Sequence, residues 1–167
     1  MILPLATAQK IAEKIASELT PFCRRIEIAG SIRRRRLAVG DIDLVVELKD
    51  HDGFQSRLQQ NTTPISTGDQ NIIVQLKNGC QLDIFTAKPG TDDLLGHTPG
   101  TWGTILLSRT GSRAHNIRLA SLAAERGLHW NPYHGIFSGK TVVASESEED
   151  IFRALGIDFV PPEKREI

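Results

Sequence analysis

Two aspartates one residue apart, Asp41 and Asp43, are the residues whose spacing points most directly to chemistry. Side chains alternate along a β-strand, so in an extended segment both carboxylates project from one face while Ile42 points the other way, into a core. Two carboxylates placed in this way can share one divalent metal ion and help to hold a second, because hard cations such as Mg²⁺ prefer oxygen ligands. The spacing therefore predicts a metal site on one face of a strand.

A third aspartate, Asp83, lies in an apolar segment between Leu82 and Ile84. A carboxylate between apolar neighbours is costly to desolvate unless it has a partner. A neighbouring strand that carries the aspartate pair would supply that partner through the metal. The alternative, a surface aspartate at a sheet edge, accounts for each carboxylate taken singly but poorly for the three together.

A Gly-Ser pair and a run of arginines, Arg33 to Arg36, precede the aspartates. Gly30-Ser31 is predicted to close a strand and to open a helical turn. Backbone N–H groups at such a turn attract phosphate, and glycine lets the phosphate approach closely. Arg34 lies one turn further on, where a guanidinium can reach terminal phosphate oxygens. Carboxylates beside such a turn are what magnesium-dependent chemistry on a nucleoside triphosphate requires.

The elements that position these residues follow from the spacing of apolar and turn residues. Asn78-Gly79 predicts a hairpin between antiparallel strands, and recurring glycines predict a loop-rich connection over 90–103. The expected fold class is α+β: a mixed β-sheet with flanking helices up to about residue 90, and a smaller α+β lobe over 91–167. Helices are predicted at about 8–19 (with Thr7 as N-cap), 54–60, 112–126 and 148–155, strands at 25–29, 42–48, 72–76 and 81–85, and a small β element over 128–143.

Positive charge is concentrated although the formal net charge is zero. Six arginines fall within the thirteen residues from Arg24 to Arg36, and local patches matter more for phosphate binding than the total charge. A second basic set, which a solvated surface explains equally well, comprises Arg109, Arg113, Arg118 and Arg126.

The remaining composition sets broad limits. No apolar run approaches the roughly 18 residues of a membrane span, and no export signal is evident, so we expect an intracellular, cytoplasmic or nucleoid-associated protein that does not contact membrane. Cys23 and Cys80 lack metal-ligand spacing and are predicted to be free thiols. With no interface signal, we expect a monomer.

Three segments carry a resemblance to a known family. The segment from Gly30 to Val46 resembles the signature of the polymerase-beta-type nucleotidyltransferase superfamily. The segment from Thr110 to Asn116 resembles the turn and helix that family X DNA polymerases place at the nucleotide sugar and base. Gly127 to Tyr133, and Leu155 to Glu163, resemble the second lobe of the bacterial members. The likeness runs from about residue 3 to residue 166 and is weakest over 49–70.

The resemblance implies a palm domain over 1–90 and a thumb-like, nucleotide-selecting domain over 91–167. Asp41 and Asp43 would bind both Mg²⁺ ions, or Mn²⁺ in their place, and Asp83 would bind the catalytic ion and help to activate the primer 3′-hydroxyl. Gly111-Ser112 would contact the sugar through a cis peptide. The implied nucleotide-binding residues are Gly30, Ser31, Arg34, Gly40, Ser108, Arg109, Thr110, Gly111, Ser112, Arg113 and Asn116. The candidate DNA-binding residues are Arg35, Arg36, His115 and Arg118, and for Arg35 and Arg36 a solvated surface is the alternative.

The implied function is a metal-dependent DNA polymerase that adds nucleotides to a primer 3′-hydroxyl and fills short gaps in repair. Its partners would be gapped primer–template DNA and nucleoside triphosphates. Two alternatives stay open: a template-independent nucleotidyltransferase, because one palm motif serves both activities, and a non-catalytic nucleic-acid-binding module. For His115, a surface position on the helix is as consistent with the sequence as contact with DNA.

The chain departs from the family pattern in three places. Relatives carry two aromatic residues before Thr-Gly-Ser that help to exclude a ribose 2′-hydroxyl, and Ser108 and Arg109 stand there. Ala120 replaces an arginine that contacts the template strand. The helix-hairpin-helix, fingers and phosphoesterase domains of relatives are not in this sequence, which leaves a minimal polymerase and a fragment of a longer one both open. We expect weak sugar discrimination, and DNA binding that depends steeply on salt.

Overall fold

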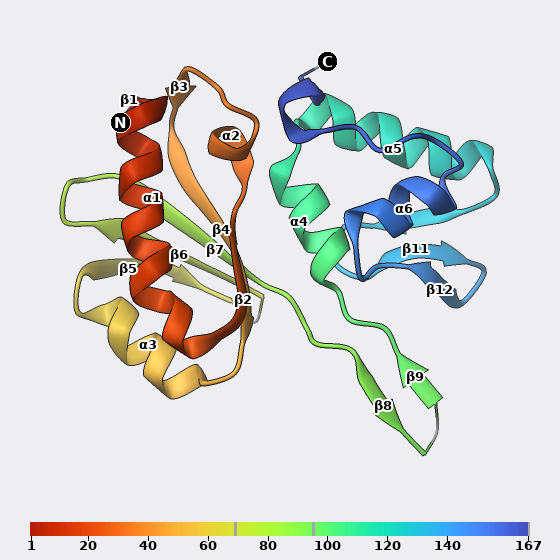
Figure 1. Cartoon of the computed structure of the whole chain (residues 1–167), viewed down its shortest axis with the longest axis horizontal. Coiled ribbons are helices and arrows are strands. Elements are labelled where there is room, and N and C mark those ends of the chain that lie inside the picture. Colours follow the sequence, from red (N-terminus) through yellow and green to blue (C-terminus); the bar gives the residue numbers. More distant parts are fainter. Residues whose placement is uncertain (69, 95, 167) are drawn as a thin grey trace. The chain divides into compact units, whose positions relative to one another are not determined.

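The computed structural model describes residues 1–68, 70–94 and 96–166, and its chain divides into two compact units, Met1–Thr86 and Ala87–Ile167 (Figure 1). Each unit is described by itself. Among the described residues, no helix combines the length and the apolar character needed to cross a membrane.

Unit 1 is built on a five-stranded mixed sheet in the order β2-β4-β7-β6-β5. Strands β4 and β7 are parallel, and the other neighbours in the sheet are antiparallel. The strands are β2 (Cys23–Ile28), β4 (Asp41–Leu48), β5 (Thr62–Thr67), β6 (Asn71–Leu76) and β7 (Gln81–Thr86), and a separate antiparallel pair joins β1 (Leu3–Pro4) to β3 (Ala38–Val39). The helices are α1 (Leu5–Leu19), the 3₁₀ turn η1 (Thr20–Phe22), α2 (Gly30–Arg33) and α3 (His51–Gln59).

Helices α1 and α3 cover one face of this sheet (Figure 1). Alternate residues of β4 and β7 point toward the helices, and Leu44 and Ile84 are fully buried there. They pack in one core cluster with Ala8 and Ala12 of α1 and Phe54 of α3. Burial of this apolar surface stabilises the unit and fixes the register, because a slip by one residue would turn every side chain to the opposite face. The aspartates therefore occupy the other face, as predicted.

The predicted hairpin is confirmed: β6 and β7 are antiparallel, and Gly79 at their turn has φ +83°. One prediction about unit 1 was wrong, and one strand was missed. Helix α1 begins at Leu5 after the extended residue Pro4, so Thr7 lies inside the helix and is not its N-cap. Strand β5 was not predicted, because it is a mostly exposed edge strand whose residues, including Pro64, lack an apolar alternation.

Unit 2 packs three α-helices around a small antiparallel sheet in the order β10-β11-β12. Its core joins Leu107, Leu119, Trp130, Ile136 and Phe152. The prediction of a small β element over 128–143 is confirmed. The elements are the hairpin β8 (Thr91–Asp93) and β9 (Gly96–Thr98), α4 (Trp102–Thr110), α5 (Arg113–Glu125), β10 (His129–Asn131), β11 (Gly135–Ser138), β12 (Thr141–Ala144), α6 (Glu148–Ala154) and the 3₁₀ turn η2 (Pro162–Lys164).

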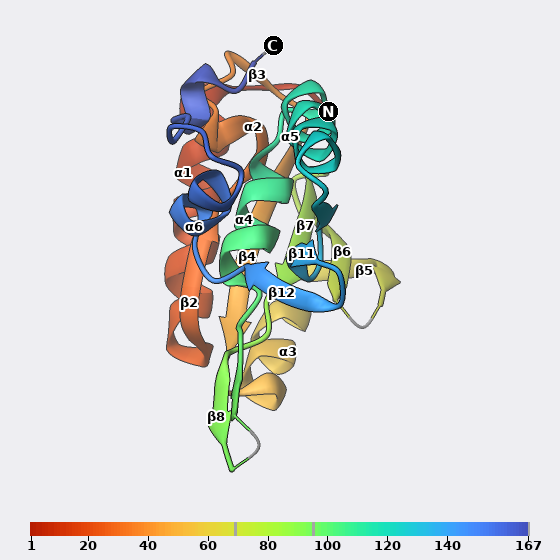
Figure 2. The ribbon, with the colours of Figure 1, turned by 90° about the vertical axis from the view of Figure 1, so that its right-hand side faces the viewer.

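The connection predicted as a glycine-rich loop over 90–103 contains structure that the glycines concealed. The β8–β9 hairpin projects away from the helices of its own unit (Figures 1 and 2). Helix α4 begins at Trp102, so Gly103 is helical. A Cβ on Gly103 would overlap the backbone of Ser147, so glycine serves close packing there and does not mark a turn. Conversely, the helices predicted at about 112–126 and 148–155 are present: Ser112 caps α5, and Gly156 follows α6 with φ +61°.

Candidate active site

Asp43 and Asp83 are register partners across the parallel strands β4 and β7, and Asp41 is the partner of Gln81 two residues earlier in each strand. Side chains of directly paired residues in adjacent strands lie close together on one face of the sheet. All three aspartates are half-buried. The register thus brings Asp43 and Asp83 together and sets Asp41 beside them on the same face.

Gly30 lies directly against this carboxylate face. It is buried, has φ +58°, and begins α2 after the extended residue Ala29. A Cβ built on Gly30 would overlap the Asp43 carboxylate. Both the backbone conformation and the contact therefore require glycine. The backbone at Ala29 is fixed from the same strand, because its N–H donates to the carbonyl of Asp43 at 2.9 Å.

Ser31 contributes a buried hydroxyl next to this turn. In the described part of the chain its Oγ has no hydrogen-bond partner. A buried hydroxyl without a partner carries a desolvation cost that a bound ligand can offset. Gly40, which precedes β4, is exposed, and a Cβ on it would meet no described atom within 4 Å. Open space therefore remains beside Gly40, and the Ser31 hydroxyl keeps a hydrogen that no described group accepts.

The donor set fits a hard divalent cation, because carboxylate oxygens on one face are the ligands that Mg²⁺ and Mn²⁺ take. Among the residues described, no three His, Cys, Asp or Glu side chains are already gathered into a metal-binding cluster. Gln81 was not singled out from the sequence, yet its Nε2 donates to Oδ1 of Asp83 at 2.8 Å. Gln81 and Asp83 are two residues apart on β7, so strand alternation places them on one face, and this spacing was the signal from which the contact could have been predicted.

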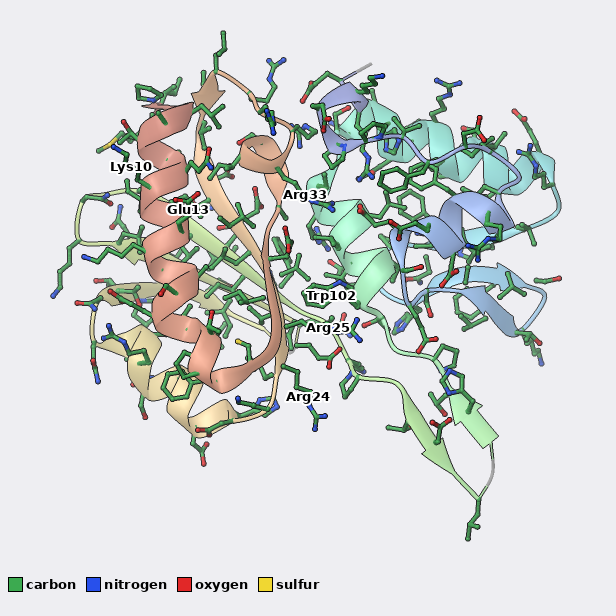
Figure 3. The ribbon with its side chains drawn as sticks, in the orientation of Figure 1. Lys10, Glu13, Arg24, Arg25, Arg33 and Trp102 are labelled. Atoms are coloured by element: carbon green, nitrogen blue, oxygen red, sulfur yellow. The ribbon has the colours of Figure 1, made fainter. Side chains whose placement is uncertain are left out.

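Apart from Arg57 of α3, the arginines of unit 1 lie on β2, on α2 and directly after α2. Arg24 and Arg25 come from the edge strand β2 and Arg33 from α2, whereas α1 carries Lys10 and Glu13 (Figure 3). Arg34 follows α2 as its C-cap, and its N–H donates to the carbonyl of Gly30 at 3.2 Å. This short turn joins Arg34 to the glycine beside Asp43. Arg35 and Arg36 are exposed.

The second group of predicted site residues surrounds the turn between α4 and α5 in unit 2. The peptide bond between Gly111 and Ser112 is cis, as the family resemblance implies, and Gly111 has φ +66°. Ser112 caps α5 by accepting from the N–H of His115 at 3.3 Å. Asn116 lies one turn into the helix, and its Nδ2 donates to the Ser108 carbonyl at 2.7 Å. Thr110 is buried, whereas Arg113 and Arg118 are exposed.

Ser108 and Arg109 stand at the end of α4 and point in different directions. The Ser108 hydroxyl is buried and turns inward. Its Oγ lies 3.0 Å from the carbonyl oxygen of Ile105 and 3.2 Å from that of Pro132, and its one hydrogen can be donated to either. The Arg109 guanidinium lies 4.9 Å from the ring centroid of Tyr133. Neither position carries an aromatic side chain of its own. The contacts of these residues with a nucleotide stay a prediction.

His115 is buried, with 2% of its surface exposed, so the alternative of a surface helix position is wrong. Its ring lies 6.0 Å from that of Phe152. Burial, and next the charge of Arg165, lower the pKa of His115 to about 4, so the ring is neutral near pH 7. Its contact with DNA stays a prediction.

Sequence reasoning also missed two buried charged residues in unit 2. Glu148 lies among the acidic residues Glu146, Glu149 and Asp150, and Arg165 lies between the charged residues Lys164 and Glu166. They form an ion pair at 2.7 Å with exposed side-chain fractions of 5% and 0%. A charge surrounded by polar residues along the chain carries no local signal of burial, so pairing across 17 residues could not be read from the pattern.

Comparison with known proteins defines the class. The family described as DNA polymerase beta thumb matches residues 105–166. The solved structure of Leishmania infantum polymerase beta in a ternary P/T complex superimposes with a TM-score of 0.75 at 20% identity, covering 100% of this chain and 77% of that one. The same protein in a ternary gap complex gives a TM-score of 0.76. The fold is therefore that of polymerase beta.

Two relatives narrow the class to a family. The DNA polymerase/3′-5′ exonuclease PolX of Bacillus subtilis is 31% identical over 98% of this chain, which spans 28% of the length of that relative. The Repair DNA polymerase X of African swine fever virus is 25% identical over 98% of this chain and 99% of its own length. This chain belongs to family X of the DNA polymerases.

Proposed function

We propose that this chain is the catalytic core of a polymerase that fills short gaps in DNA, transferring a nucleotide from a nucleoside triphosphate to a primer 3′-hydroxyl. The observation that carries the proposal is the pairing of Asp43 with Asp83 beside Gly30. It sets two carboxylates on one face of the sheet, against a turn whose glycine admits no side chain. The viral relative, almost wholly spanned by this chain, bears the name of a repair polymerase.

The metal would be held by Asp41, Asp43 and Asp83. Bound divalent cations supply charge that stabilises the attacking and leaving oxygens of an in-line displacement. Asp83, paired with Asp43 and hydrogen-bonded by Gln81, would accept the proton of the primer hydroxyl or orient that hydroxyl.

The triphosphate would lie against the turn after β2. The Ser31 hydroxyl, buried and without a described partner, would donate to a phosphate oxygen, and Arg34 would offer charge-assisted hydrogen bonds. In unit 2, the turn at Gly111-Ser112 and the side chain of Asn116 would contact the sugar and base. The exposed Arg35, Arg36 and Arg118 would bind DNA phosphates, with an affinity that falls steeply as salt rises.

Primer extension tests this function. A one-nucleotide-gapped duplex and the same primer as a single strand are each incubated with Mg²⁺ or Mn²⁺ and with every nucleotide separately. We expect extension only on the gapped duplex and only with the complementary nucleotide. Equal extension of the single strand with any nucleotide would make the protein a template-independent transferase. No extension under any metal would contradict catalysis by this chain and leave the nucleic-acid-binding module.

A further inference from the structure

Arg165 is fully buried although it is one of the last residues of unit 2. Its Nη1 donates to Oε1 of Glu148 at 2.7 Å, and its Nε donates to the carbonyl of Val160 at 2.8 Å. The acceptors come from α6 and from the segment that follows it. Because the guanidinium is planar and its donors are fixed in a fork, these contacts hold its position and orientation.

Two aromatic rings complete the enclosure of this guanidinium. The Cζ of Arg165 lies 5.4 Å from the ring centroid of Phe152 and 5.4 Å from that of Phe159. The two rings meet edge to face at 5.3 Å. A cation over aromatic faces is attracted by their quadrupoles, more strongly where water is excluded. The side chain therefore fixes the end of the chain against α6.

The backbone of Arg165 reaches the turn between α4 and α5. Its carbonyl accepts from Oγ of Ser112 at 2.7 Å and from the N–H of Ser112 at 3.3 Å. The Ser112 hydroxyl has a single hydrogen, which it gives to Arg165, and its oxygen accepts the N–H of His115 to cap α5. One hydroxyl thus joins the end of the chain to the start of α5.

These contacts form a continuous chain from Glu148 to the proposed nucleotide-selecting turn. Glu148 accepts a hydrogen bond from the Arg165 guanidinium, and the backbone carbonyl of Arg165 accepts two from Ser112. Asn116 lies one turn into the helix that Ser112 caps. Its side chain is positioned by that helix and by its hydrogen bond to the Ser108 carbonyl. If the end of the chain shifted, both hydrogen bonds to Ser112 would lengthen, and the cap of α5 would shift with them.

We propose that Arg165 is a positioning residue for nucleotide selection, which it serves without touching the nucleotide, by holding the Gly111-Ser112 turn through its own backbone carbonyl. The proposal rests on the proposed function and adds to it a residue 53 positions along the chain from the turn. Binding sites need support of this kind because small displacements of contact groups cost much affinity and rate.

Three variants test the proposal: Arg165→Lys, which keeps the charge and loses the fork; Glu148→Gln, which keeps an oxygen acceptor; and the control Glu163→Gln, at an exposed neighbouring position. Steady-state extension of a gapped primer gives KM for the nucleotide and kcat, and amide hydrogen exchange gives the protection of Ser112 and His115. We expect Arg165→Lys to raise KM about tenfold with kcat within about twofold.

Exchange at Ser112 and His115 should accelerate in Arg165→Lys, while exchange at Leu119, in the interior of α5, stays as in the wild type. Glu148→Gln should move both readouts in the same direction by less, and Glu163→Gln should move neither. If Arg165→Lys unfolds unit 2, the KM and the exchange rates of Glu148→Gln alone test the proposal.

A folded variant with wild-type KM and wild-type exchange at Ser112 overturns the proposal. An inactive wild type contradicts the proposed function instead, and the exchange comparison still decides whether Arg165 holds the turn.

Discussion

Gly30 leaves room for the carboxylate of Asp43, which a Cβ at that position would overlap. Gly30→Ala would therefore displace Asp43 and also strain a backbone at φ +58°. We expect transfer to fall by about 100-fold or more, because the turn that we propose to bind phosphate and the carboxylate both move. Gly139→Ala is a matched control, since Gly139 has the same φ of +58° and a Cβ there meets no described atom within 4 Å. Similar activity losses in the two variants would contradict the role of the overlap.

Asp83→Asn keeps the shape of the side chain and removes its charge. If Asp83 binds the catalytic metal, transfer should fall by about 1,000-fold, since metal-ion stabilisation of transition-state charge contributes several kcal/mol. Melting without metal should change little. Alanine at Asp41 or Asp43 should abolish transfer in the same way, whereas Asp52→Asn, at an exposed position on α3, should retain it. Normal transfer by a variant of Asp41, Asp43 or Asp83 would contradict the proposal that this carboxylate binds the metal.

Discrimination between deoxyribonucleotides and ribonucleotides should be weak. The hydroxyl of Ser108 turns inward and Arg109 stacks on Tyr133, so neither residue offers the aromatic side chain that relatives carry there. We expect kcat/KM for a ribonucleotide within about tenfold of that for its deoxy partner. Arg109→Phe should widen the ratio. A wild-type preference of many thousandfold for the deoxyribonucleotide would contradict this prediction.

Acid should destabilise unit 2 through His115. Its pKa is about 4 in the folded protein, against 6.5 for a free histidine. Between these values the unfolded chain binds a proton that the folded unit does not, so stability falls as pH decreases from 6.5 toward 4 and this group contributes no further loss below that.

The full effect of His115 is up to about 3 kcal/mol. Thermal unfolding of the wild type and of His115→Phe across this pH range measures it, because the variant lacks the titrating ring. Equal slopes of melting temperature against pH in the two proteins would show that His115 does not titrate in this way.

Much of unit 1 was predictable because its pattern is local. The alternation around Asp41 and Asp43, and the Asn78-Gly79 turn, determine which face each side chain occupies. The register of Asp43 against Asp83 is not local, because it depends on closing a parallel pair around α3, β5 and β6. The exposed strand β5 offered no alternation from which to predict it.

In unit 2, the cap at Ser112 was visible in the sequence as a serine before a helical segment, and the small sheet as apolar residues among turn residues. Helix α4 was concealed because Gly103 was interpreted as a loop residue, whereas its role is close contact with the backbone of Ser147. The burial of Arg165 depends on a distant partner, Glu148, and polar composition alone indicates the opposite.

The parallel pairing of β4 with β7 has a consequence for how the protein folds. Forty residues separate Asp43 from Asp83, so their alignment closes a long loop, whereas β6 and β7 join across a tight turn. Contacts between residues distant in sequence form slowly, because the chain loses the entropy of loop closure before the contact stabilises it. The local hairpin should therefore form early and the carboxylate face late. A partly folded chain can then hold most of its secondary structure before the site exists.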